Sequence, residues 1–141
     1  MTILDHVLLP IASEEDAIST CEAIEPHLSN VGRVTAIHVI EKAEGAIDKA
    51  PIGKRREDAA AFLSVVEERI GDEVVVETRT VFGRSVVEAI FDTATEVDAT
   101  AVAFRPRGGN RIARLLAGDT ATNIVTNPAV PVVSLPLRRD D

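Results

Sequence analysis

The sequence predicts a doubly wound α/β domain built around a five-stranded parallel sheet. Short apolar and β-branched runs alternate along the chain with amphipathic segments that are long enough to be right-handed crossover helices. The composition agrees, because 141 residues that are 45% hydrophobic and 27% charged can bury one core without disulfides. We therefore expect one domain over residues 1–141, with a solvated tail at 136–141.

The first strand is predicted at residues 5–10, where a proline closes a short apolar run. A helix is expected to follow from residue 14 to residue 27 or 28, because apolar residues recur there at helical spacing. Ser13, with Asp16 three residues later, resembles a capping box at the start of this helix. Cys21 lies on the apolar stripe, and we expect it to be an inert core residue.

The middle of the chain predicts two further strands and one helix. The β-branched run at 33–40 predicts the second strand, and an apolar helical pattern predicts a helix at 54–70 that Gly71 ends. Residues 41–53 carry two glycines, a proline and mixed charge without periodicity, which indicates a long mobile connection. Apolar and polar residues alternate late in the third strand, at 74–81, and this pattern favours an edge position in the sheet.

The last third of the chain predicts two helices and two strands. Ser85 and Glu88 form a capping box before an apolar stripe that extends to Val97. The fourth strand is predicted at 99–104. After a basic, glycine-containing segment, a further helix is expected to end near Thr126, and a final strand follows it.

The fifth strand is predicted at 130–135, and Pro131 places it at an edge because proline donates no hydrogen bond to a central ladder. An apolar edge strand needs a cover, and the simplest cover is the same strand of a second copy. We therefore expect a homodimer through the fifth strand, with an interface formed by Val130, Val132, Val133 and Leu135.

Charge and cysteine content narrow the function classes. A formal net charge of −8 argues against nucleic acid as a partner, because binding phosphate backbones needs a basic face. No apolar run approaches membrane-spanning length and the first ten residues lack a signal-peptide core, so we expect a cytoplasmic protein without a membrane partner. A single cysteine, without a Cys/His cluster, argues against a disulfide scaffold or a zinc site.

Residues 105–120 form the candidate site, because they follow the fourth strand at the end of the sheet where open α/β folds bind ligands. The segment has glycines that allow close approach of backbone N–H groups, and it has four arginines in an acidic chain. A helix that begins near Gly118 would direct its positive end toward a phosphate. Catalysis is not indicated, because His38 has no nucleophile with an orienting partner, and we expect it to be a satisfied core histidine.

Six segments make the sequence resemble the universal stress proteins. They are Val7-Leu-Leu-Pro10, Ala36-Ile-His-Val-Ile40, Val81-Phe-Gly-Arg84, Asp98-Ala-Thr-Ala-Val102, the glycine segment after the fourth strand, and Val130-Pro-Val-Val133. The resemblance spans nearly the whole chain. It implies a sheet in the order 3-2-1-4-5, as in adenine nucleotide alpha-hydrolase-like folds, dimerisation through the fifth strand, and a role in the stress response.

The resemblance also shows where this chain departs from the ATP-binding members of the family. Those members use Gly-x2-Gly-x9-Gly followed by Ser or Thr, together with an Asp just after the first-strand proline. Gly108 and Gly118 match this pattern, but Arg105 replaces the first glycine. Asp119 replaces the hydroxyl residue, and Ala12 stands near the lost Asp. A carboxylate at about 4 Å from a phosphate charge costs about 1 kcal/mol in water and about 4 kcal/mol at an effective dielectric constant near 20, so we expect weakened ATP binding.

Three hypotheses for this crevice stay open alongside a binding or regulatory role that is not enzymatic. In the first, ATP or AMP binds and is hydrolysed slowly and incidentally. In the second, Arg105 or Arg107 pairs with Asp119 and closes the crevice, so that the protein is a pure interaction module for a regulatory protein partner. In the third, phosphate or sulfate binds Arg107 and the amides of Gly108 and Gly109. The candidate binding residues, with no metal among their ligands, are Pro10, Ala12, Val39, Ile40, Phe104, Arg105, Arg107, Gly108, Gly109, Gly118, Asp119 and Thr120.

Overall fold

The computed structural model describes residues 2–41, 52–105 and 128–136. Its strands are β1 (His6–Pro10), β2 (Arg33–Glu41), β3 (Val75–Gly83), β4 (Ala101–Phe104) and β5 (Val132–Ser134), and its helices are α1 (Glu14–Ile24), the 3-10 helix η1 (Glu25–Asn30), α2 (Ile52–Ile70) and α3 (Val86–Glu96). The strands pair in parallel, in the order β3-β2-β1-β4-β5. The fold class and the strand order that the resemblance implies are confirmed.

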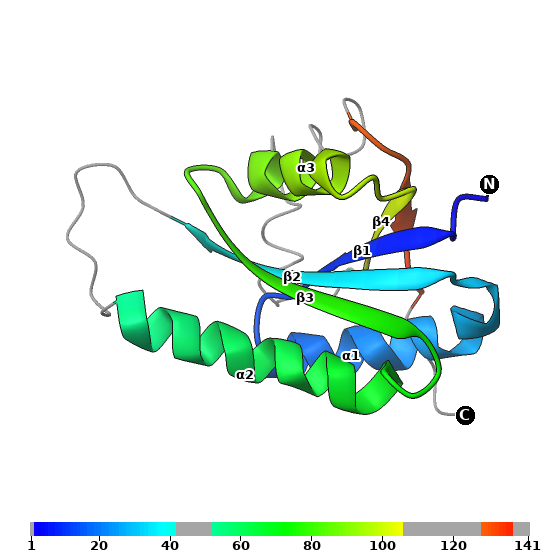
Figure 1. The fold of residues 1–141 in the computed structure, drawn as a ribbon, viewed down its shortest axis with the longest axis horizontal. Helices are drawn as coiled ribbons and strands as arrows, with labels where there is room; N and C mark the ends of the chain where they lie inside the picture. Colours follow the sequence, from blue (N-terminus) through cyan, green and yellow to red (C-terminus); the bar gives the residue numbers. More distant parts are fainter. Residues whose placement is uncertain (1, 42–51, 106–127, 137–141) are drawn as a thin grey trace.

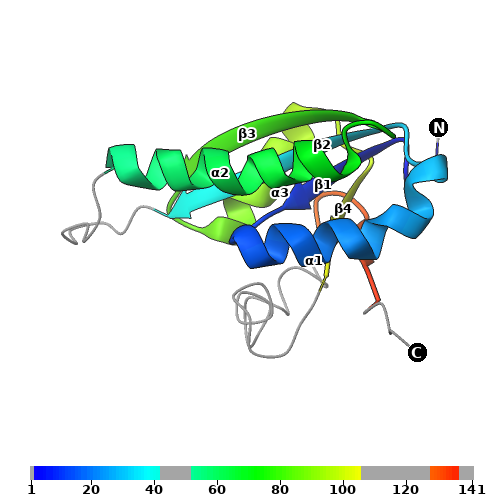
Figure 2. The same ribbon diagram turned by 90° about the horizontal axis from the view of Figure 1, so that it is seen from below.

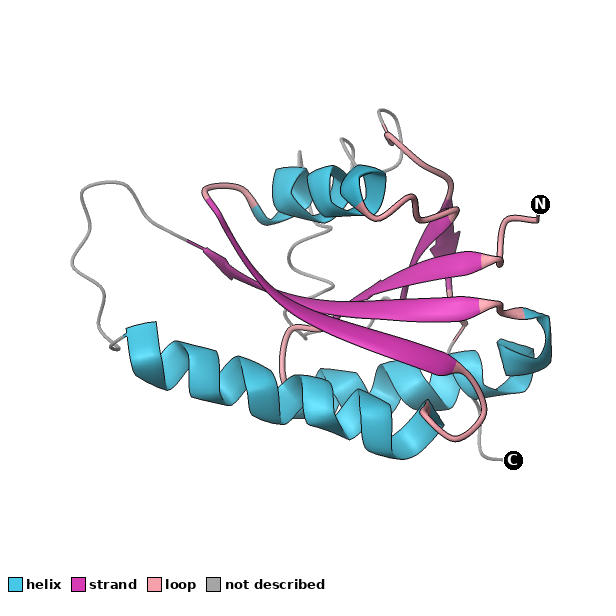
Figure 3. Cartoon of the chain, in the orientation of Figure 1, coloured by secondary structure: helices cyan, strands magenta, loops and turns pink. Residues whose placement is uncertain are grey.

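Helices cover both faces of the sheet. α1 and α2 lie side by side on one face, and α3 lies on the other (Figure 1 and Figure 2). Figure 3 shows the twisted strands between these two layers. None of the described helices is long and apolar enough to cross a membrane.

β1 is the central strand, and each of its residues is buried. Such an apolar run is typical of a parallel strand that is covered on both faces. Its side chains alternate, so that Val7 and Leu9 join the core beneath α1 and α2, whereas Leu8 joins the core beneath α3. Thr100 ties down the amino end of this strand, because its hydroxyl accepts the His6 N–H at 2.9 Å and donates to the Ile3 carbonyl at 2.6 Å.

Two predicted boundaries were wrong for clear physical reasons. The first α-helix ends at Ile24 instead of residue 27 or 28, because Pro26 lacks the N–H that another α-helical turn needs, and the chain continues as η1. β4 begins at Ala101 instead of residue 99, because Asp98 takes up a φ of 59° after α3 and delays the return to extended backbone.

The other elements lie close to their predicted positions. β3 and β5 occupy the two edges of the sheet, as predicted, although β5 forms its ladder only over Val132–Ser134. α2 begins at Ile52, slightly before the predicted start. The mobile connection predicted at 41–53 lies mostly outside the described residues, as do the helix predicted to end near Thr126 and most of the tail.

Candidate functional site

The carboxyl ends of β1 and β4 define the candidate crevice. From β1 the chain moves outward through β2 and β3, and it then returns to β4 on the opposite side of β1, so the strand order reverses between these two neighbours. Open α/β sheets bind ligands at such a switch point. The structure therefore brings Pro10, at the end of β1, and Ala12, in the loop that follows it, to the same end of the sheet as Phe104 and Arg105.

Hydrogen bonds hold the loop between β1 and α1 from several directions. The N–H of Ile11 donates to the Ile37 carbonyl at 2.7 Å, and the Ile11 carbonyl accepts from Nδ1 of His38 at 2.6 Å. The N–H of Ala12 donates to a carboxylate oxygen of Asp16 at 2.8 Å. Each of these three backbone groups therefore already has a partner within the chain.

His38 serves to position this loop. Its Nδ1 atom carries a hydrogen, since the Ile11 carbonyl oxygen can only accept. Its ring also meets the ring of Phe62 edge to face, with centroids 5.3 Å apart. The prediction of a satisfied histidine is confirmed, although the side chain is only half-buried.

Asp16 also lies near this end of the sheet. The sequence predicted it only as part of the helix start and not as a residue of the candidate site. It is 4% exposed, and its two carboxylate oxygens accept from the Ala12 N–H at 2.8 Å and the Thr20 hydroxyl at 3.3 Å. Ser13 in turn caps α1 by accepting the Asp16 N–H at 3.1 Å. The capping box is thus present in a shifted form, in which the Asp16 carboxylate accepts from the N–H of the residue before the N-cap and not from that of the N-cap itself. The Ser13-x-x-Asp16 pattern was the only signal for it.

β2 extends beyond the end of β1 at this end of the sheet. Because Pro10 pairs with Ile37, Val39 and Ile40 extend two and three residues further, a distance of about 7–10 Å. Val39 is half-buried, and Ile40 is buried in the sheet. The structure thus supports their predicted place at the carboxyl end of the sheet.

β4 ends on the other side of β1 from β2. Phe104 is buried, and its carbonyl accepts the Leu135 N–H at 2.7 Å, which ties the end of β4 to β5. Arg105 follows immediately and is half-buried, with its Nη1 atom inside the protein. An arginine at the position of the first motif glycine therefore directs part of its guanidinium inward.

Half of the predicted binding residues fall outside the described part of the chain. They are Arg107, Gly108, Gly109, Gly118, Asp119 and Thr120. The predicted pairing of Arg105 or Arg107 with Asp119 and the predicted anion site also involve these residues. Among residues 2–41, 52–105 and 128–136, no group of three or more His, Cys, Asp or Glu side chains is arranged to hold a metal ion.

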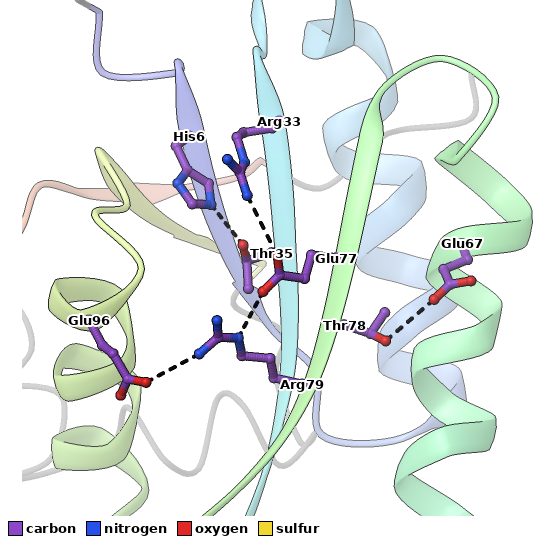
Figure 4. A network of polar contacts seen from close by, with 8 residues as sticks. All are labelled: His6, Arg33, Thr35, Glu67, Glu77, Thr78, Arg79 and Glu96. Carbon is purple, nitrogen blue, oxygen red and sulfur yellow. Dashed lines mark hydrogen bonds and ion pairs between the residues drawn. The ribbon is translucent and has the colours of Figure 1, made fainter.

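A second polar cluster lies near the amino end of the sheet, on the face that carries α3 (Figure 4). Glu77 accepts from Nε of Arg79 at 2.8 Å and lies 3.5 Å from a guanidinium nitrogen of Arg33. Arg79 also reaches Glu96 at 3.3 Å. The hydrogen bond from Arg79 is the main cause that lowers the pKa of Glu77 below its ordinary value. This cluster is absent from the sequence-based predictions, although Glu77 and Arg79 alternate in the edge strand.

A buried histidine adjoins this cluster. Nε2 of His6 lies 2.7 Å from the Thr35 hydroxyl, and both residues are almost completely buried. Burial lowers the pKa of His6 below its ordinary value, and the positive charge of Arg33 lowers it further. His6 is at the amino end of β1, away from the end at which this fold binds ligands.

Comparison with known proteins identifies the family. The sequence profile of the universal stress protein family matches residues 4–136, which is nearly the whole chain. The chain belongs to the universal stress protein family. This membership confirms the resemblance seen in the sequence. No curated protein sequence matches the chain.

Solved structures of other universal stress proteins share its architecture. A family member from Burkholderia pseudomallei superimposes with a TM-score of 0.73 at 17% identity, covering 96% of this chain and 98% of that one. The universal stress protein from Archaeoglobus fulgidus in complex with dAMP gives a TM-score of 0.62 at 19% identity, covering 95% and 99%. A universal stress protein in complex with cAMP gives 0.63 at 19% identity, covering 97% and 100%. These likenesses establish the shared fold.

Proposed function

We propose that this universal stress protein is a homodimeric binding and regulatory module of the stress response that has lost the family's mode of ATP binding. Its family membership supports the stress-response role. The loop after β1 carries the rest of the proposal. Ala12 stands near the position of the motif Asp, and its N–H is committed to the Asp16 carboxylate.

Both features act against a bound nucleotide. Ala12 has no side-chain acceptor, so a hydrogen bond worth about 0.5–1.5 kcal/mol net is lost. The Asp16 carboxylate adds negative charge beneath the same loop, and Asp119 adds another at the motif hydroxyl position. Each carboxylate that lies about 4 Å from a phosphate oxygen would weaken binding by about 1–4 kcal/mol.

Isothermal titration calorimetry of the full chain tests this proposal with ATP and magnesium as the probe. We expect no measurable heat from the unmodified chain and a gain of affinity in Asp119→Ser, which restores the hydroxyl and removes the charge. Asp92→Ser, which removes an exposed carboxylate on α3, is the matched control and should leave binding unchanged. Tight binding of ATP by the unmodified chain, undiminished relative to Asp119→Ser, would refute the proposal.

A mononucleotide is the second candidate ligand, because structures of related proteins are described as complexes with dAMP and with cAMP. AMP carries fewer phosphate charges than ATP and meets less repulsion from Asp119. Gly108, Gly118 and Thr120 with the backbone of Val39 and Ile40 would hold it. Heat from AMP but not from ATP or inorganic phosphate would favour this candidate. Heat from phosphate alone would favour the small-anion site at Arg107, Gly108 and Gly109.

We also propose that the homodimer forms through β5. The Val102 N–H donates to the Pro131 carbonyl and the Leu135 N–H to the Phe104 carbonyl, so odd-numbered residues of this segment face β4. Successive backbone groups alternate in direction, which turns those of Val132 and Ser134 toward the free edge. These outward groups, in a short apolar strand, support pairing with a second β5. Leu135 is 4% exposed in the core of its own chain and its N–H is bonded to β4, so its place in the interface stays a prediction.

Ser134→Pro tests this interface, because it removes one outward N–H and leaves the ladder to β4 intact. We expect analytical ultracentrifugation to show loss of the dimer while the circular dichroism spectrum is retained. Ser134→Thr keeps the N–H and should keep the dimer. A monomeric unmodified chain would refute this part of the proposal. The prediction of a cytoplasmic location also stands as a proposal, supported by the single cysteine, which is free and buried.

A further inference from the structure

The β3 edge is long and carries an exposed apolar side chain. β3 runs over nine residues, Val75–Gly83, and among the described residues it has a strand neighbour, β2, on one side only. Val75 is 69% exposed, and it is one of two exposed large hydrophobic residues in the described part of the chain. An exposed edge of this length is a template for pairing with another strand.

The register of the sheet shows which backbone groups face outward from β3. The Ile11 N–H donates to the Ile37 carbonyl. The backbone N–H and C=O groups of odd-numbered residues in β2 therefore point toward β1, and those of even-numbered residues point toward β3. In the parallel register that pairs Val34 with Val76, the even-numbered residues of β2 exchange backbone hydrogen bonds with the odd-numbered residues of β3. The backbone groups of Val76, Thr78 and Thr80 therefore point away from β2.

The β3 sequence is complementary to itself when it is read antiparallel about Thr78. In that arrangement Glu77 lies opposite the partner's Arg79, and Arg79 lies opposite the partner's Glu77. Val75 lies opposite the partner's Val81, which would cover its exposed surface. Thr78 is one of the outward-facing residues, so the central pair exchanges two backbone hydrogen bonds. The flanking charged pairs then occupy the closer, non-hydrogen-bonded positions, with Cα atoms about 4.5 Å apart.

Charge selects this register over its neighbours. A two-fold axis at position 77 would place Glu77 opposite the partner's Glu77, and an axis at position 79 would place Arg79 opposite the partner's Arg79. Like charges directly opposite each other destabilise a strand pair, whereas opposite charges stabilise it. The side chains of Glu77 and Arg79 are 40% and 39% exposed, so they can contact a second copy of the chain in addition to the residues of their own chain (Figure 4).

We infer that the β3 edge is a docking surface for the β3 edge of a second copy of this chain, joined antiparallel about Thr78. Seven paired residues span about 24 Å. Such a pair buries less than the roughly 1,200–2,000 Å² of a stable interface, so the association is weak and depends on protein concentration. It uses the edge opposite to β5 and does not depend on the β5 dimer. If both edges pair, the copies assemble beyond a dimer.

A charge-swap experiment tests the pairing by sedimentation velocity over a range of protein concentrations. Glu77→Arg places cations opposite the partner's Arg79 twice, and Arg79→Glu places anions opposite the partner's Glu77 twice. Two opposite-charge pairs become like-charge pairs in each variant, so we expect the dissociation constant of the β3–β3 association to rise about tenfold or more. An equimolar mixture should regain it, because the two variants are complementary across the edge while the ion pair within each chain stays broken.

A second ion pair supplies the matched control. Glu22 on α1 and Arg69 on α2 lie 4.0 Å apart, and their side chains are 50% and 44% exposed. Glu22→Arg and Arg69→Glu change the same charges away from β3 and should leave association unchanged. Thermal melts of all four variants test whether each one is folded. A monomeric unmodified chain, charge variants that associate normally, or a mixture that fails to associate would each refute the proposal.

Disulfide crosslinking tests the position of the two-fold axis. Thr78→Cys places the new thiol opposite its own copy at a Cα separation of about 5.5 Å, within the range that a disulfide bridges. Thr80→Cys lies on the same strand face, but its two copies are about 14 Å apart along the strands. Cys21 does not interfere, since burial raises the pKa of its thiol to about 11. We expect mild oxidation to crosslink Thr78→Cys only. Equal crosslinking of both variants, or of neither, would refute the axis at Thr78.

Discussion

The two faces of the sheet are buried in different ways, although the same strands form both. Beneath α1 and α2 the core is continuous and apolar, and Leu9 is fully buried there among residues such as Val66. Beneath α3 the apolar core that the described residues form is smaller and centres on Leu8 and Ile37. Toward the amino end of that second face, buried His6 and the charged cluster around Glu77 replace apolar side chains (Figure 4).

Within the described part of the chain, the difference follows from how much of each face the helices cover. α1 and α2 together cover one face, whereas α3, with 11 residues, is the helix of the described chain that covers the other. Where none of the described helices supplies apolar partners, the strands carry polar groups that satisfy one another, because an unpaired buried polar group is costly. The stability of the face beneath α3 therefore depends partly on individual hydrogen bonds, whereas the stability of the face beneath α1 and α2 depends on apolar packing.

The largest expected effect comes from matched core deletions in β1. Leu9→Ala removes side-chain volume from the continuous face and Leu8→Ala removes it from the smaller one, and both residues are 0% exposed. Each change should lower the free energy of unfolding by about 2–5 kcal/mol, with Leu9→Ala at the upper end because its neighbourhood is less able to relax. Urea unfolding at equal protein concentration measures both. A larger loss in Leu8→Ala would show that the faces do not differ in this way.

A second comparison replaces one threonine on each face by valine, which has nearly the same shape. Thr35→Val leaves buried His6 without its hydroxyl partner at 2.7 Å, and it should lower the free energy of unfolding by about 1–3 kcal/mol. Thr78→Val removes only an exposed hydrogen bond to Glu67 at 3.3 Å, and it should change that free energy by at most about 0.5 kcal/mol. The same urea titrations measure both variants. Equal effects would mean that the His6 contact does not stabilise its face.

The sequence predicted the apolar face better than the polar one, for a physical reason. Helical spacing and β-branched runs report directly on burial, so the strands, the edge positions and the paired helices followed from them. The Glu77 cluster joins β2, β3 and the end of α3, and no local pattern indicates which distant charge Arg79 will meet. The end of the first α-helix was also missed, because helical spacing continues to Leu28 although Pro26 changes the hydrogen bonding.

The candidate site was predicted as a place but not as a set of contacts. The position of Pro10, Ala12, Phe104 and Arg105 at the switch point follows from strand order alone. The bond from the Ala12 N–H to Asp16 does not, because the usual capping box returns to the N-cap residue itself. Only a three-dimensional structure shows whether the Asp16 carboxylate accepts from the N–H of Ala12 or from that of Ser13.

The smallest expected effect is a pH dependence that belongs to the polar face alone. Folding lowers the pKa of His6 from 6.5, chiefly through burial and then through Arg33, while the backbone of Asp98 and the charge of Glu77 act in the opposite direction. The unfolded chain therefore binds more protons than the folded chain once the pH falls below about 6.5. Stability that is fully present above this pH should decline as the pH falls from 6.5 toward the lowered pKa of the folded state.

Urea titrations between pH 7.5 and pH 5 measure this decline in the unmodified chain and in two histidine variants. His6→Gln removes the titrating group, so its stability should fall less steeply below pH 6.5 than that of the unmodified chain. His27→Gln removes an exposed histidine and should leave the slope unchanged. If His6→Gln keeps the full slope, the titrating group lies elsewhere, and the polar face contributes to stability through its neutral hydrogen bonds alone.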